Sequence, residues 1–240
     1  MLRKDGRSPD ELRPLTFTPD FVIYPEGSVL IAMGNTKVLC NVSIEIGVPK
    51  WKLISGVSGG WITGEYSLLP RSTHTRSSRE TRGLSGRTQE IKRLIGRSLR
   101  SAFDLEILGE YTCIVDCDVI QADGGTRTAA ISGGYLALRI ALEKMIATGV
   151  LSPSVFLSPV AAISVGILNR QALLDLNYEE DSAAEVDLNL VMNAEGDFIE
   201  IQGTAEGDPF SRGLLNNLLD LGMKGICELL SKQAEAYKNI

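Results

Sequence analysis

Residues 116–128, with the sequence DCDVIQADGGTRT, combine several groups that could bind an oxyanion. An apolar run that predicts a strand ends in two glycines, and a long helical segment follows. Glycines let the backbone approach an anion closely, and the first N–H groups of a helix point outward at its positive end. Thr126 and Arg127 add a hydroxyl and a guanidinium. The sequence therefore predicts an anion site at this turn.

A plain strand-to-helix turn, with Thr126 or Thr128 as the N-cap, is the alternative interpretation. Arg127 bears on the choice, because a cation in the first turn opposes the helix dipole at a cost of roughly 0.3 to 1 kcal/mol. A bound anion would offset that cost. Arg87, just before a helix predicted over 88–103, could bind the same anion with a second guanidinium. It could equally be one more solvated arginine in a basic stretch.

Two aspartates bracket an acidic turn at 179–187 and enter a predicted strand. Strand alternation places Asp187 and Asn189 on one face, opposite the apolar side chains at 186, 188, 190 and 192. If that face lines a cleft, Asp181 and Asp187 could hold a hard cation, because Mg²⁺ needs only one or two carboxylates beside substrate phosphates. A solvated acidic turn is the alternative.

Basic residues are concentrated between 71 and 100. This stretch holds nine basic residues and two acidic ones, a net charge of +7, although the formal net charge of the chain is -6. Such segregation marks a polyanion site better than the overall charge does. Arg71, Arg76 and Arg79 lie in a predicted loop, where long side chains could follow a nucleic-acid backbone. A loop at a subunit interface is the competing interpretation. We assign no catalytic role to His74.

The periodicities predict strands, helices and turns that alternate along the whole chain. Strands are predicted at 21–24, 28–33, 37–46, 111–120, 160–168, 172–176, 184–192 and 198–202, and helices at 88–103, 127–147 and 211–237. Residues 48–86 read as a long irregular connection. This order suggests an α/β (α+β) fold of two similar halves, each a sheet backed by helices. No linker interrupts it, so we expect one domain over 1–240.

Composition points to an intracellular enzyme. The charged first twenty residues predict no secretory signal, and no apolar run approaches the length of a membrane span. The four cysteines and single histidine lack the spacing of a structural zinc site, so we expect reduced thiols and a cytoplasmic location.

Several motifs together resemble the ribonuclease PH family of phosphate-dependent 3′-exoribonucleases. They cover residues 3–7, 13–14, 60–63, 69–71, 74–76, 79–80, 86–91, 116–128, 180–182, 202–207 and 209–212. The order and number of the motifs make the resemblance specific over nearly the whole chain. The departures are small: Gly64 stands where alanine is familiar, and Asn193 where threonine is common.

The resemblance implies a ring hexamer made of three dimers and a fold of two pseudo-repeated halves. It implies that Arg87, Gly125, Thr126 and Arg127 bind inorganic phosphate, the co-substrate, and that the aspartates at 181 and 187 bind the metal, Mg²⁺ or Mn²⁺.

The implied reaction trims the 3′ ends of transfer RNA precursors and other structured RNA such as ribosomal RNA, releases nucleoside diphosphates, and runs in reverse to add nucleotides. One rival function is a non-catalytic RNA-binding ring subunit, which predicts a degraded phosphate turn. Another is a phosphotransferase on free nucleotides, which would not need the basic stretch.

Overall fold

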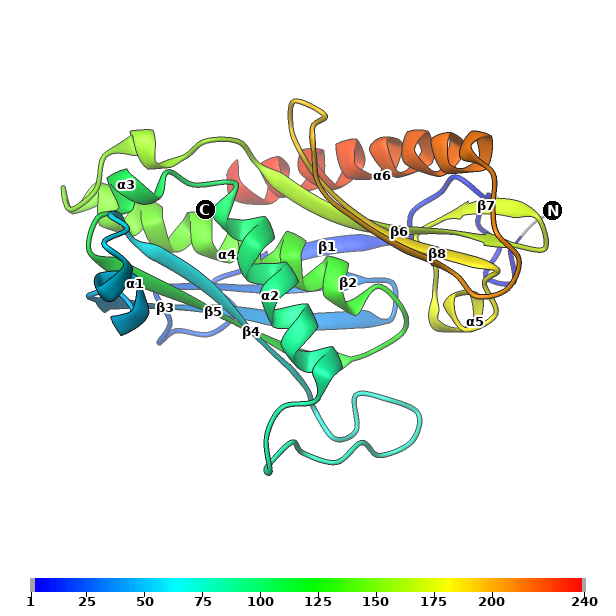
Figure 1. Ribbon diagram of the computed structural model, residues 1–240, viewed down its shortest axis with the longest axis horizontal. Helices are drawn as coiled ribbons and strands as arrows, with labels where there is room; N and C mark the ends of the chain where they lie inside the picture. Colours follow the sequence, from blue (N-terminus) through cyan, green and yellow to red (C-terminus); the bar gives the residue numbers. More distant parts are fainter. Residues whose placement is uncertain (1–2, 239–240) are drawn as a thin grey trace.

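The computed structural model describes residues 3–238, which form two β-sheets with helices between and beside them (Figure 1). The first sheet has the strand order β1 (Leu15–Pro19), β2 (Gly27–Met33), β3 (Thr36–Ile46), β5 (Tyr111–Gln121) and β4 (Trp61–Leu68). The second has the order β7 (Gln171–Leu174), β6 (Val160–Leu168), β8 (Val186–Asn193) and β9 (Phe198–Ala205). One sheet per half is as predicted. The sheets differ in one pairing, since β4 and β5 run parallel whereas all neighbours in the second sheet are antiparallel.

The helices are α1 (Lys50–Ser55), α2 (Gly86–Arg100), α3 (Leu105–Leu108), α4 (Thr126–Ala147), α5 (Tyr178–Asp181) and α6 (Arg212–Lys238), with a short 3-10 turn at Pro153–Val155. Helix α4 contacts β2 and β3 of the first sheet and β6 of the second, so it forms the layer between them. It is apolar on nearly every side, and every residue from 128 to 138 is buried.

Glycines permit this close packing. A Cβ at Gly27 would lie 2.0 Å from the carbonyl oxygen of Ala137, and one at Gly133 would lie 2.7 Å from Ile31 Cγ2. One hydrophobic core runs through both halves as a result, and it includes side chains of both sheets and of α4.

The predicted strand pattern was wrong in two stretches of the first half. Residues 21–24 form no strand, and Ile23 and Tyr24 are 85% and 92% exposed. The edge strand is instead β1, which pairs with β2. Residues 48–86 are not irregular throughout, because they contain α1 and all eight residues of β4. Only 69–85 is a long loop without helix or strand, and it projects from the body at the bottom of Figure 1.

Helix α2 begins at Gly86, two residues before the predicted start, and Ser85 is its N-cap. The Ser85 hydroxyl accepts a hydrogen bond from the Thr88 backbone N–H at 3.2 Å. Arg87 therefore lies inside the first turn of α2 rather than before the helix.

The four cysteines are free, and Cys40, Cys113 and Cys117 are buried. Within residues 3–238 no helix is both long and apolar enough to span a membrane.

Candidate active site

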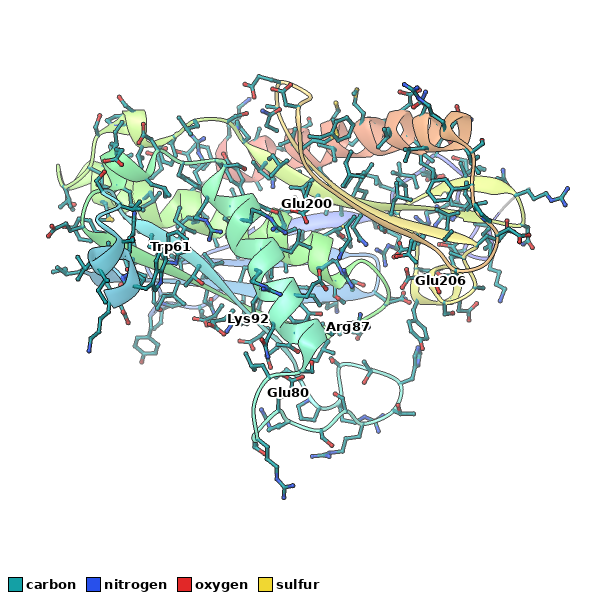
Figure 2. All side chains as sticks on the ribbon, viewed as in Figure 1. Trp61, Glu80, Arg87, Lys92, Glu200 and Glu206 are labelled. Carbon is teal, nitrogen blue, oxygen red and sulfur yellow. The ribbon has the colours of Figure 1, made fainter. Side chains whose placement is uncertain are left out.

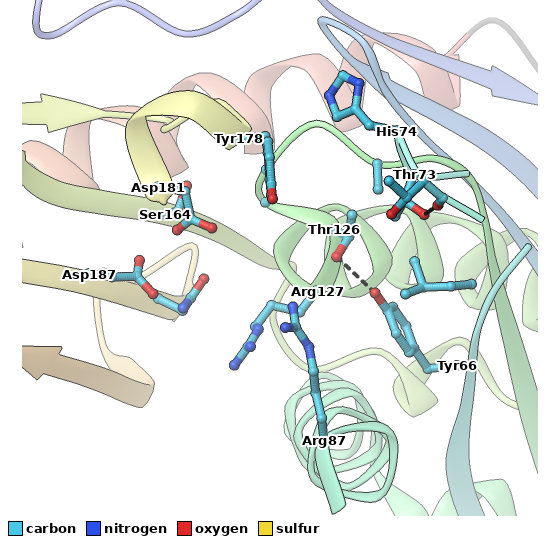
Figure 3. Close-up of a pocket in the computed structure, with 16 residues that line it drawn as sticks. Tyr66, Thr73, His74, Arg87, Thr126, Arg127, Ser164, Tyr178, Asp181 and Asp187 are labelled. Atoms are coloured by element: carbon cyan, nitrogen blue, oxygen red, sulfur yellow. Dashed lines mark hydrogen bonds between the residues drawn. The ribbon is translucent and has the colours of Figure 1, made fainter. Parts of the chain in front are cut away.

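A cavity of about 410 Å³ opens between the two sheets, where β5 ends and α4 begins (Figure 3). Helix α2 and the start of α4 form one wall, and β6, α5 and β8 form the other. All six residues predicted to bind phosphate or metal line it. These are Arg87, Gly125, Thr126, Arg127, Asp181 and Asp187.

The two glycines at the end of β5 adopt a conformation that other residues avoid. Gly124 has a φ of +75° and Gly125 a φ of +64°. A Cβ at Gly124 would also lie 2.5 Å from the carbonyl oxygen of Leu176. Gly125 is the N-cap of α4 and offers no side-chain acceptor. The predicted alternative, a threonine N-cap, is therefore wrong.

Three backbone N–H groups at the start of α4 are consequently available. The first bond of the helix runs from the N–H of Ala129 to the carbonyl of Gly125 at 3.0 Å. The N–H groups of Thr126, Arg127 and Thr128 find no acceptor in the part of the chain that the structure describes. They lie at the amino-terminal end of α4, next to the cavity, where the positive end of the helix dipole stabilises an anion.

Contacts from distant segments hold this turn in place. The Thr36 hydroxyl donates to the carbonyl of Gly124 at 2.6 Å and accepts from the N–H of Asp123 at 3.0 Å. Arg13, only 4% exposed, donates to the carbonyl of Asp123 and pairs with the fully buried Asp175 at 2.6 Å. Burial disfavours the charged guanidinium, but the charge and hydrogen bond of Asp175, together with the charges of Asp123 and Glu180, raise the pKa of Arg13.

The two arginines of the cavity differ in their partners. Arg127 donates to Gln202 Oε1 at 2.7 Å and lies 3.6 Å from the Glu90 carboxylate. Arg87 is exposed and has no ion-pair partner among residues 3–238. Both lie close enough to Asp187 to lower its pKa. Two cations thus converge between the start of α4 and the aspartates (Figure 3).

The aspartates come from α5 and β8. Asp187 and Asn189 line the cavity on the same face of β8, which confirms the predicted alternation. Burial first, and the charge of Asp181 second, raise the pKa of Asp187 to about 6 against the opposing charge of Arg127. Burial also raises the pKa of Asp181, against the effect of Arg127. Asp181 ends helix α5 and is not on the open turn that the sequence suggested.

One oxygen bears on metal binding. Asp187 Oδ1 is buried without a hydrogen-bond partner. Residues 3–238 contain no cluster of three or more His, Cys, Asp or Glu suited to a metal. A cation here would depend on Asp181, Asp187 and oxygens of the substrate, which is the ligand set that Mg²⁺ accepts. The unpartnered Oδ1 fits such an ion.

Sequence reasoning missed two aromatic residues of the cavity, Tyr66 and Tyr178. Tyr66, buried on β4, shares a hydrogen bond of 2.8 Å with the Thr126 hydroxyl, and burial raises the pKa of its phenol. It was missed because β4 was read as irregular. Tyr178 and His74 lie at the mouth, with ring centroids 5.7 Å apart. His74, to which the sequence analysis assigned no catalytic role, lines the cavity from the basic loop.

The arginines of that loop lie outside the cavity. Arg71, Arg76 and Arg79 are exposed in 69–85, while residues 73–75 between them line the cavity. Glu80 accepts a hydrogen bond from the Thr88 hydroxyl at 2.9 Å, which ties the loop to the start of α2 (Figure 2). The basic loop therefore leads directly to the mouth of the cavity.

Comparisons with known proteins agree with this arrangement. Models of the 3′ exoribonuclease family match residues 11–142 with domain 1 and residues 158–225 with domain 2. Ribonuclease PH of Bacillus subtilis (strain 168) is 58% identical over 237 residues, which cover 98% of this chain and 96% of that protein. Ribonuclease PH of Dehalococcoides mccartyi (strain CBDB1) is 56% identical over 235 residues, 97% of each chain.

Two solved structures share the fold. Rice (Oryza sativa) Rrp46 has a TM-score of 0.78 at 21% identity and covers 97% of this chain and 98% of its own. An archaeal exosome core chain has a TM-score of 0.77 at 23% identity, covering 97% of this chain and 91% of its own. With family models matching most of its length and relatives above half identity, this chain belongs to the 3′ exoribonuclease family.

Proposed function

We propose that this cavity carries out phosphorolysis at the 3′ end of RNA. Inorganic phosphate attacks the terminal phosphodiester, the preceding 3′ oxygen leaves and takes a proton, and a nucleoside diphosphate is released. The substrates are transfer RNA precursors and other structured RNA such as ribosomal RNA, and the reverse reaction adds nucleotides. One observation carries the proposal: unpaired N–H groups and two arginines face two carboxylates across a single cavity.

The wall formed by α2 and α4 binds the phosphate. The free N–H groups at the start of α4 and the hydroxyl of Thr126 donate to it, and Arg87 and Arg127 balance its charge. Gly125 lets the backbone approach. Where the Thr126 hydroxyl donates to a deprotonated phosphate oxygen, it accepts from Tyr66 Oη. Catalysis comes mainly from positioning and from charges already in place.

The opposite wall stabilises the leaving 3′ oxygen. A bound Mg²⁺ or Mn²⁺ would neutralise the charge that develops there. Asp181 and Asp187 would hold that ion. Asp181 or Asp187 also relays a proton to the leaving 3′ oxygen.

RNA reaches the cavity past the basic loop. Arg71, Arg76 and Arg79 contact the phosphate backbone, and the terminal base lies against His74 and Tyr178 at the mouth. The active form is a homohexamer, a trimer of dimers. We place the enzyme in the cytoplasm, which the four free cysteines support.

The rival function of a non-catalytic ring subunit receives less support. It predicts a damaged phosphate turn, whereas Gly124 and Gly125 keep the backbone that the turn requires and the first N–H groups of α4 are free. A phosphotransferase on free nucleotides would leave the basic loop beside the mouth unexplained. A binding competition between RNA and a mononucleotide separates this phosphotransferase from the proposed exoribonuclease.

The decisive test uses a transfer RNA with a 3′ extension, with and without inorganic phosphate. We expect nucleoside diphosphates that appear only when phosphate is present. Nucleoside monophosphates formed without phosphate would refute the proposal. Arg127→Ala and Arg87→Ala should each lower turnover by roughly 10²-fold, the loss typical of one preorganised donor, while RNA binding survives. Turnover within a few-fold of wild type would remove that arginine from the site.

A further inference from the structure

We infer that Gln202 on β9 is a positioning residue that holds Arg127 in place for phosphate. The inference rests on the proposed function and adds to it a residue that does not line the cavity itself. Arg127 Nη1 donates to Gln202 Oε1 at 2.7 Å. The Arg127 side chain is only 20% exposed, so this contact restricts where its guanidinium can point.

The amide of Gln202 is oriented by Glu90 on α2. Gln202 Nε2 donates to Glu90 Oε1 at 2.9 Å. Because an ionised carboxylate can only accept, the amide nitrogen must face Glu90, and the amide oxygen must face Arg127. An amide oxygen has a further consequence. It holds the guanidinium without adding a second negative charge beside the Glu90 carboxylate, which lies 3.6 Å from Arg127.

Strand pairing links Gln202 to the opposite wall. Gln202 pairs with Asn189, and two residues away Thr204 pairs with Asp187. The contact with Arg127 therefore connects the strand ladder that carries Asp187 to the first turn of α4. Through it, Gln202 fixes the spacing between the phosphate-binding wall and the carboxylate wall.

A purely structural role in docking β9 onto α2 is the alternative, and the chain offers a matched control for it. Glu200, two residues away on the same strand, pairs with Arg97 of the same helix at 2.7 Å (Figure 2). That pair joins the same two elements without contacting Arg127. If Gln202 only docks β9 onto α2, replacing Gln202 or Glu200 should have the same effect.

The experiment compares Gln202→Met with Glu200→Met. Methionine keeps the length of either side chain but offers no strong acceptor. For each enzyme we would measure the KM for phosphate, the KM for a 3′-extended transfer RNA, kcat and Tm. A hydrogen bond to a charged group supports an expected rise of about tenfold in the phosphate KM of Gln202→Met. Its RNA KM and Tm should stay near wild type, and Glu200→Met should leave both KM values unchanged.

An unchanged phosphate KM in Gln202→Met, or a parallel loss of phosphate and RNA affinity in both variants, would overturn the inference. Calorimetric titration with inorganic phosphate alone separates this outcome from failure of the proposed function. If wild type forms no nucleoside diphosphate yet binds phosphate more tightly than Gln202→Met, phosphorolysis is refuted and the positioning role stands. If wild type forms the diphosphate and Gln202→Met binds phosphate equally well, only the positioning role is refuted.

Discussion

The pKa of Asp187 is the most direct measure of the electrostatics between the two walls of the cavity. It is raised from 3.8 to about 6, first by burial and second by the charge of Asp181, while Arg127 lowers it. We therefore expect Asp181→Asn to lower the pKa of Asp187 by roughly 0.5 to 1 pH unit, equivalent to about 0.7 to 1.4 kcal/mol at 1.36 kcal/mol per unit. Burial alone should keep the remaining pKa above 4.

Carbon-13 NMR of labelled aspartate carboxyl groups, titrated across this pH range, measures the value without needing activity. Glu179→Gln is the matched control, because Glu179 lies on the same short helix but is exposed and pairs with Lys4 at 2.7 Å. It should leave the pKa of Asp187 unchanged. A wild-type pKa near 4, or the same value in wild type and Asp181→Asn, would refute the reasoning.

Three further perturbations test other parts of the site. Asp187→Asn should abolish metal-dependent turnover yet raise the free energy of unfolding at pH 8 by about 1 kcal/mol, a value reduced for solvent access. The pKa of Asp187 is higher in the folded state than in the unfolded state, so ionisation of this carboxyl opposes folding. The stability gain of Asp187→Asn should therefore be full above about pH 6 and absent below pH 4, which calorimetric unfolding at several pH values measures. Gly124→Ala should destabilise the fold by roughly 1 to 3 kcal/mol and weaken phosphate binding, because the residue has a φ of +75° and an added Cβ would meet the Leu176 carbonyl. A denaturation curve of the variant that matches that of the wild type would contradict this. Replacing Arg71, Arg76 and Arg79 by glutamine should lower the logarithmic salt slope of RNA binding by about 2 to 3, with sedimentation to confirm that assembly is intact; an unchanged slope in an intact assembly would exclude the loop as the RNA path.

The site was predictable where its chemistry follows the chain closely. Strand, glycine pair and helix start are contiguous at 116–128, and the structure places Thr126 and Arg127 in the first turn of α4 as that order predicts. The apolar alternation in β8 likewise placed Asp187 on the cavity face. Such patterns are local, so a single segment of the sequence is enough to predict them.

Contacts between distant segments were not predictable. Tyr66 reaches Thr126 across sixty positions of the sequence, and Gln202 reaches Glu90 across 112. No local pattern marks such partners. The false strand at 21–24 has a related cause: short apolar runs look like strands, and only tertiary packing shows that Ile23 and Tyr24 remain exposed. The short helix α5 was missed because its Asn177–Glu180 capping box lies within a run of acids.

The buried arginines of the amino-terminal segment also constrain when the protein can become active during synthesis. Arg3 pairs with Glu180, and Arg13 pairs with Asp175, which lies 162 residues further along the chain. Ribosomes release the amino terminus first, so these cations lack their carboxylate partners until about three quarters of the chain has emerged. Because Arg13 also holds Asp123 beside the glycine turn, a nascent chain with its first sheet already folded would still lack an ordered phosphate site. Phosphate affinity should therefore appear late in translation, only after β7 and α5 have reached the amino-terminal segment.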